Sequence, residues 1–271
     1  MRRRLRVITL EGEEYHHIME TTAPMTDRSR NMDERTWWDL WNRSYRTEDN
    51  NDEVSSELFV RTAAVINNVT QSGTGRVLEI GCGAGSLSRL LTYSSYHGLD
   101  ISPAAIDIAR KQAELMQQPR GAGSATYEVT DFHEWPLPSG SFDVVVCVDA
   151  VAYFRDQRLA LKKIAQCLRT RGRLVLTTIN PFVYRRIRRM WENGPISHWL
   201  SRHELHRLID SAGLKIERSY TIMPRGHLGI LRLINARRVS EAFGPHLTAV
   251  PRRLKERVGL GQYRVVVAQK D

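Results

Sequence analysis

The residues with the clearest chemical potential lie at positions 79–86, where the sequence reads EIGCGAGS. Glycines alternate with small residues at 81, 83 and 85, directly after an apolar run. Because glycine adopts positive φ and lets a ligand approach the backbone closely, this segment is predicted to bind a small molecule. Glu79 stands two residues before the first glycine. A carboxylate at that place would attract a cationic ligand and repel a diphosphate.

A dinucleotide is the alternative ligand for such a segment. The dinucleotide fingerprint G-x-G-x-x-G/A would start at Gly81 and would require Gly or Ala at the position of Ser86. This departure, together with the charge of Glu79, disfavours an NAD-dependent oxidoreductase, which is kept as a less favoured alternative.

Two more acids follow at the ends of apolar runs. Asp100 comes about 20 residues after the glycines, where a carboxylate can accept the hydroxyl groups of a ribose. Asp131 is followed by Phe132, an acid that could accept an amino proton of adenine and a ring that could pack on the base. Each acid could instead cap a helix, and the ordered succession of these residues is what favours a binding site.

The elements that must position these residues alternate between strand and helix, which predicts an α/β fold with a doubly wound parallel sheet. Helical patterns occupy 86–93, 102–116, 156–170 and 201–213, the last with Ser201 and Glu204 as a capping box. The strand-like runs lie at 76–80, 96–101, 125–132, 141–150, 173–180, 214–223 and 262–270.

The chain is expected to divide near residue 50. Residues 1–50 are predicted to contain a flexible N-terminal segment and an aromatic helix, and residues 51–271 the main domain, with a basic insertion at about 225–261 between its last two strands. Trp38 and Trp41 stand three residues apart and therefore share one helix face. They could form a lid over the ligands, or simply dock the helix onto the domain.

An excess of positive charge is the main feature of the composition. The chain has 40 Lys and Arg against 30 Asp and Glu, a formal net charge of +10. This balance suits an anionic partner, although scattered surface arginines would give the same count. The three cysteines form no CxxC pair, so neither a disulfide framework nor a metal site is expected. Since no apolar run approaches the about 18 residues of a membrane span, a cytoplasmic protein is expected.

Four stretches give the chain a resemblance to the class I S-adenosylmethionine-dependent methyltransferases that act on small molecules. They are VLEIGCGAG, GLDIS, VTDF with WPLPSGSFDVVVCVDA, and GRLVLTTIN, which together span roughly residues 75–180. The resemblance implies a Rossmann-like, seven-stranded, mostly parallel sheet with an antiparallel last pair, to which the aromatic N-terminal helix is expected to add a lid. It also implies S-adenosylmethionine as the cofactor.

By position, the resemblance implies cofactor contacts with the methionine part, the ribose, the adenine and the sulfonium. The implied residues are Glu79, Gly81, Cys82, Gly83 and Gly85 for the methionine part and the turn, Asp100 for the ribose, Ile101, Asp131 and Phe132 for the adenine, and Asp149 near the sulfonium.

The acceptor and any catalytic base are less well defined. Many relatives carry a histidine soon after the fourth strand, but this chain reads DAVAYFRD there, so Tyr153 and His227 are the candidates for a catalytic role. Trp38, Trp41, Tyr153 and Arg185 are the candidates for binding the acceptor. The expected reaction is methyl transfer to an O or N atom of a small molecule, acidic or aromatic in character. Methylation of RNA or a peptide, through the basic C-terminal region, is the alternative.

Overall fold

The computed structural model describes residues 33–45, 63–69, 75–115, 123–184, 198–224 and 259–271. Most of the predicted basic insertion and the first 32 residues lie outside this part of the chain. No helix in the described part combines the length and the apolar character needed to cross a bilayer.

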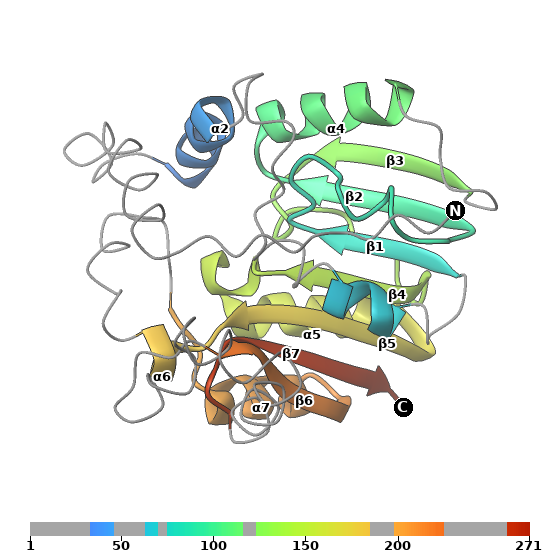
Figure 1. The fold of residues 1–271 in the computed structure, drawn as a ribbon. Coiled ribbons are helices and arrows are strands. Elements are labelled where there is room, and N and C mark those ends of the chain that lie inside the picture. The colour runs from blue at the N-terminus through green and yellow to red at the C-terminus, as the bar shows by residue number, and fades with distance from the viewer. Residues whose placement is uncertain (1–32, 46–62, 70–74, 116–122, 185–197, 225–258) are drawn as a thin grey trace, which may run out of the picture.

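A seven-stranded sheet forms the centre of the fold, in the order β3-β2-β1-β4-β5-β7-β6 (Figure 1). The first five strands are parallel to one another, and β7 runs antiparallel to both β5 and β6. This arrangement confirms the predicted fold class. The strand bounds are β1 Arg76–Ile80, β2 Ser95–Asp100, β3 Ser124–Val129, β4 Phe142–Val148, β5 Leu168–Ile179, β6 Leu214–Pro224 and β7 Gly261–Lys270.

Apolar layers cover both faces of the sheet. One layer joins the sheet to α5 (Gln157–Cys167) and α7 (Arg202–Ser211), through residues such as Leu161 and Leu205. The other joins it to α4 (Pro103–Leu115) and the helix at 63–69, through residues such as Ile106 and Val65. Because the central strands are buried on both sides, their runs are almost wholly apolar.

Local capping explains where several helices begin. Asp156 accepts a hydrogen bond from the backbone N–H of Leu159, which starts α5. Ser201 and Glu204 form the predicted capping box at the start of α7.

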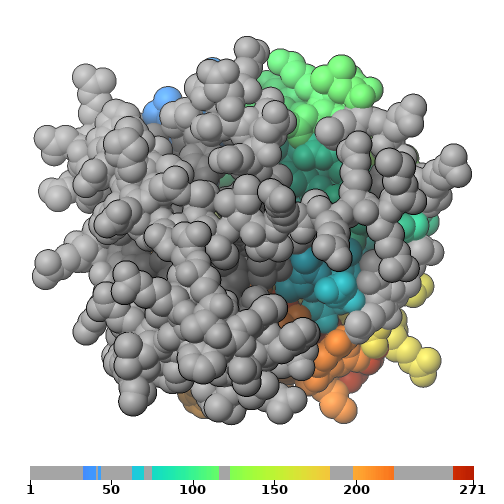
Figure 2. All heavy atoms as spheres, viewed as in Figure 1, coloured from blue at the N-terminus to red at the C-terminus, as the bar shows by residue number. Residues whose placement is uncertain are grey.

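Two further helices lie near the carboxyl edge of the sheet. The aromatic segment forms α2 (Glu34–Tyr45), which lies beside α4 in Figure 1, and a short helix, η4 (Val151–Tyr153), follows β4. Figure 2 shows α4 in green and the α7–β6 region in orange at opposite ends of the visible face.

One predicted helix is wrong. Residues 83–90 form consecutive turns instead of the helix expected at 86–93. Gly83 and Gly85, just before the predicted helix, hold positive φ values of 53° and 68°, so no right-handed helix extends back through the glycine turn. The hydroxyl of Ser88 also donates to the carbonyl of Gly85, a local bond that competes with helical pairing.

Candidate active site

The glycine turn lies at the carboxyl ends of β1 and β2. The backbone N–H groups of Gly81 and Cys82 both donate to the carbonyl of Leu99, at 2.8 and 3.0 Å. Gly81 has a φ of +74°, and a Cβ there would come within 2.7 Å of the Ala150 side chain. The turn therefore needs glycine both for its backbone conformation and for its close approach to the end of β4.

Asp100 ends β2 directly beside this turn. One of its carboxylate oxygens accepts the backbone N–H of Gly83 at 2.8 Å, and the other accepts the N–H of Ser102 at 3.0 Å. These two bonds fix the orientation of the carboxylate at the mouth of the sheet. They also show that Asp100 organises the glycine turn, a role that the sequence did not reveal.

Glu79 is a buried carboxyl beneath the turn, with an exposed fraction of 3%. Burial raises its pKa to about 8, and the nearby charge of Asp100 raises it too, while a hydrogen bond from the Tyr96 hydroxyl acts in the opposite direction. The group is therefore mostly protonated at neutral pH. A cation placed beside it would favour its ionised form.

The turn after β3 carries Asp131, Phe132 and His133. Asp131 accepts the backbone N–H of His133 at 2.8 Å and forms an ion pair with Arg155 at 3.2 Å. Phe132 is buried, and its ring centre lies 5.8 Å from that of Phe154. This turn thus places an acid next to an aromatic ring, and both residues line the cavity described below.

Lys163 of α5 holds the same turn through hydrogen bonds to its backbone. Its ammonium group donates to the carbonyls of Phe132, His133 and Trp135, at 2.8, 3.0 and 2.5 Å. The ammonium also lies 5.3 Å from the centre of the Phe132 ring. Sequence reasoning missed this lysine because it lies about 30 residues away in a helix with ordinary amphipathic spacing.

Asp149 follows β4 in an unusual conformation. Its φ is +56°, in a region that non-glycine residues rarely adopt. The hydroxyl of Thr177 donates to its carboxylate at 2.7 Å, and its backbone N–H donates to the Thr177 carbonyl at 3.0 Å. The neighbouring strand thus holds Asp149 in place against the local strain, a pattern found often at functional sites.

The N-terminal helix α2 closes the site from the other side. The rings of Trp38 and Tyr153 meet edge to face, with their centres 4.8 Å apart. Asp39 accepts the backbone N–H of Ala104 at 2.8 Å, which ties α2 to the first turn of α4. Glu34 also faces the site, and burial, followed by repulsion from Asp131, raises its pKa to about 7.

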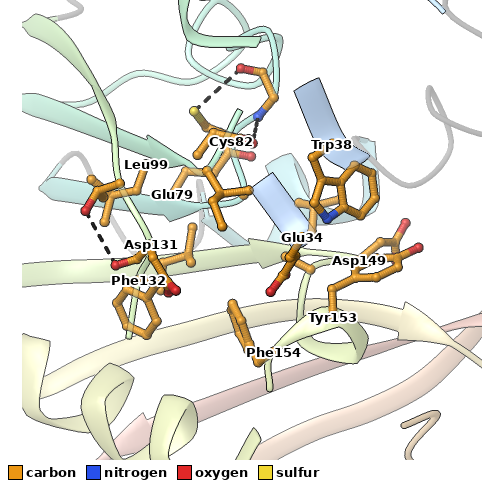
Figure 3. Close-up of a pocket in the computed structure, with 18 of the residues that line it drawn as sticks. Glu34, Trp38, Glu79, Cys82, Leu99, Asp131, Phe132, Asp149, Tyr153 and Phe154 are labelled. Atoms are coloured by element: carbon orange, nitrogen blue, oxygen red, sulfur yellow. Dashed lines mark hydrogen bonds between the residues drawn. The ribbon is translucent and has the colours of Figure 1, made fainter. Parts of the chain in front are cut away.

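These elements enclose a cavity of about 370 Å³ (Figure 3). Nine of the ten residues predicted to contact the cofactor line it, together with Trp38 and Tyr153. The exception is Gly85, where a Cβ would come within 2.8 Å of the Tyr127 ring. The side chain of Trp41, and the residues Arg185 and His227, lie outside the described residues. The lining residues that sequence reasoning missed are Glu34, Asn42, Ile80, Ser86, Leu87, Leu99, Thr130, His133, Val148, Ala150 and Phe154.

The charge of the lining is one-sided. Five carboxyl residues line the cavity, and no lysine or arginine does so in the part of the chain that the structure describes. These carboxyl groups suit a ligand with a net positive charge, such as a molecule with a sulfonium and an amino group. They would repel a diphosphate. The five residues are Glu34, Glu79, Asp100, Asp131 and Asp149.

Comparison with known proteins agrees with this geometry. A family described as a methyltransferase domain matches residues 43–219. An O-methyltransferase of Pyrenophora dematioidea is 28% identical over 121 residues, which are 44% of each chain. The mitochondrial ubiquinone biosynthesis O-methyltransferase of Schizosaccharomyces pombe is 32% identical over 54% of this chain and 52% of its own length. The chain thus spans about half the length of the curated relatives it matches.

Solved structures show the same fold. An S-adenosylmethionine-dependent methyltransferase from Mesorhizobium loti aligns with a TM-score of 0.54 at 20% identity, covering 77% of this chain and 96% of its own. A Haemonchus contortus N-methyltransferase, in complex with phosphomonomethylethanolamine and S-adenosylhomocysteine, aligns with a TM-score of 0.62 at 17% identity, covering 88% and 61%. With the family match, the sheet order and the acid-lined glycine turn, the chain belongs to the class I S-adenosylmethionine-dependent methyltransferases.

Proposed function

We propose that this protein transfers a methyl group from S-adenosylmethionine to an O or N atom of a small-molecule acceptor. The observation that carries the proposal is the cavity at the carboxyl ends of β1, β2 and β4, where a bare glycine turn meets five carboxyl residues. S-adenosylmethionine has a net positive charge, which this lining suits.

Each part of the cavity has a role in this proposal. Asp100 would hold the ribose hydroxyls, since its carboxylate is already oriented by two backbone N–H groups. Asp131 and Phe132, fixed by Lys163, would hold the adenine. Glu79 and Asp149 would lie near the positive charges of the methionine part. The remaining lining residues proposed for this part are Gly81, Cys82 and Gly83, with Ile101 against the adenine. Gly85 does not line the cavity; it would serve the turn by leaving room for the Tyr127 ring.

The acceptor would enter where α2 meets η4. The cofactor supplies a methyl group already activated on a positively charged sulfur. The protein then needs mainly to align the acceptor atom and to exclude water. The rings of Trp38, Tyr153 and Phe154 supply flat apolar surfaces for both purposes. A hydroxyl acceptor must also lose a proton, and the Tyr153 hydroxyl is the group we propose for orienting or accepting it.

The relatives favour oxygen as the methylated atom. The two relatives described above are O-methyltransferases, and a 31% identical Streptomyces relative is an aklanonic acid methyltransferase. Nitrogen stays as the second possibility, because the Haemonchus enzyme of the same fold is an N-methyltransferase. The basic excess of the chain keeps RNA as an alternative acceptor, with an acidic small molecule preferred.

Calorimetric titration tests the cofactor half of the proposal. S-adenosylhomocysteine is expected to bind in one-to-one ratio, and NADH is expected to give no heat of binding. Binding of NADH alone would refute the proposal. A methyl-transfer screen with labelled cofactor then tests the acceptor half. RNA as acceptor would show binding that weakens steeply with salt, whereas a neutral small molecule would not.

A further inference from the structure

Arg264 is a buried arginine that the methyl-transfer site does not use. It lies in β7, between β5 and β6, and only 7% of the residue is exposed. Among the described residues its guanidinium has no hydrogen-bond or ion-pair partner, and its nitrogens are not fully closed off from solvent. Arg173, on the neighbouring strand β5, shows the usual arrangement: it binds the carboxylate of Glu217 through two nitrogens, at 2.9 and 3.1 Å.

The strand register places Arg264 on a known face and at a known edge of the sheet. Arg264 pairs with Thr178 of β5 and with Thr221 of β6. Since side chains alternate along a strand, Arg264 shares its face with Val266, which belongs to the core under α5 and α7. Thr178 is the penultimate residue of β5, so Arg264 lies near the carboxyl edge, where the cofactor cavity also lies.

Helix α7 brings a second positive charge to this place. The ring of His206 binds the hydroxyl of Ser219 at 2.8 Å, and Ser219 pairs with Val266. Arg202 lies four residues before His206 in α7, about 6 Å along the helix axis. It is therefore farther than His206 from the loop that joins α7 to β6. Arg264 lies two residues from Val266 in β7, about 7 Å along the strand. This step also leads away from the loop that joins α7 to β6. Arg202 and Arg264 therefore lie on facing surfaces at the same height.

Electrostatics agrees with this placement. Burial, followed by repulsion from Arg202, lowers the pKa of Arg264 to about 10. Arg264 still carries its charge at neutral pH. A largely buried charge with no counter-ion among the described residues is costly for a protein, and an anion that joins both guanidinium groups would offset this cost.

We propose that Arg264 and Arg202 form a binding site for a carboxylate or phosphate group, at the carboxyl edge of the β5–β7–β6 half of the sheet. Guanidinium groups match the geometry of both anions, because their N–H groups can donate in parallel pairs. The site lies at the same edge of the sheet as the cofactor cavity. The anion could come from the acidic group of an acceptor or from free inorganic phosphate. Only the acceptor as source depends on the proposed function.

Thermal unfolding in the presence of inorganic phosphate tests the site without any methyl transfer. Phosphate is expected to raise the Tm of the full chain with a saturating dependence, beyond the effect of sodium chloride at equal ionic strength. R264Q and R202Q are each expected to bind phosphate at least about tenfold more weakly, the loss of a hydrogen bond between charged groups. R158Q, which removes an exposed arginine from α5, should keep the full effect.

Two outcomes would overturn the site. One is a wild-type Tm that does not respond to phosphate; the other is an undiminished response in both arginine variants. Arg202 is exposed, so R202Q should fold even if R264Q does not, and its result then decides the question. Binding of S-adenosylhomocysteine by the wild-type protein is measured separately, so failure of the proposed function leaves the phosphate result standing.

A comparison of acidic acceptors with their methyl esters separates the two sources. If the acceptor supplies the anion, the acid has the lower KM in the wild-type enzyme, and R202Q loses this preference. If free phosphate is the ligand, acid and ester have equal KM values and phosphate does not compete with either. A protein that binds neither the acid nor phosphate at this site contradicts the proposal.

Discussion

Replacing Glu79 by glutamine should change how the stability of the protein depends on pH. The pKa of Glu79 rises from 4.5 to about 8 on folding, mainly through burial. Folding therefore takes up a proton between these pH values, and the native state loses stability as the pH rises through this window. Where folding takes up one full proton, the free energy of unfolding falls by about 1.4 kcal/mol per pH unit. Between pH 5 and pH 7 this amounts to about 2.5 kcal/mol, because the unfolded carboxyl is already mostly ionised at pH 5.

Glutamine keeps the shape of the side chain and an oxygen that can accept the hydrogen bond of Tyr96, but it cannot ionise. The free energy of unfolding of both proteins is measured by urea denaturation at half-unit steps from pH 5 to pH 8. E79Q is expected to gain stability relative to wild type as the pH rises. Other titrating groups, including Glu34 with its raised pKa, cancel because both proteins contain them. A difference that stays constant from pH 5 to pH 8 would refute the assignment of a neutral Glu79.

Three further substitutions test the cofactor site, each by calorimetric titration with S-adenosylhomocysteine. D100A should weaken binding by about 1.5–3 kcal/mol, through lost hydrogen bonds to a charged group, and unchanged affinity would place the ribose elsewhere. G83V should abolish binding, because Gly83 has a φ of +53° and a branched side chain would occupy cofactor space. Circular dichroism should show the sheet retained, and binding by folded G83V would contradict the close approach. K163M should weaken binding of both S-adenosylhomocysteine and adenosine about tenfold, since three carbonyls of the turn after β3, which is proposed to hold the adenine, lose their common donor. The matched control K162M removes an exposed lysine of α5, and an equal loss there would show that Lys163 does not position the turn.

The parts of the fold that depend on local pattern could be predicted from the sequence. Short β-branched runs gave the strands, and the capping box at Ser201 gave the start of α7. The helix expected at 86–93 was wrong, because local bonds such as the one from the Ser88 hydroxyl to the Gly85 carbonyl compete with helical pairing there. The antiparallel position of β7 came only from the family resemblance, since strand order depends on contacts between distant segments.

The candidate site divides in the same way. Residues at the ends of strands, such as Asp100 and Asp131, could be found because parallel strands place their carboxyl ends at one edge. Lys163 and Glu34 could not be found, since each reaches the site from a helix remote in sequence. The pairing of Arg202 with Arg264 was equally hidden, because only the register of β6 on β7 brings the two to the same height.

The acidic lining of the cavity has a consequence for turnover under the proposed reaction. Loss of the methyl group converts a sulfonium into a neutral thioether, so the ligand gives up one positive charge while it is still enclosed. Carboxyl groups such as Asp149 and Asp100 then attract the spent molecule less strongly than the fresh one. The same side chains that recruit the donor would thereby ease departure of the by-product and limit its inhibition of the next cycle.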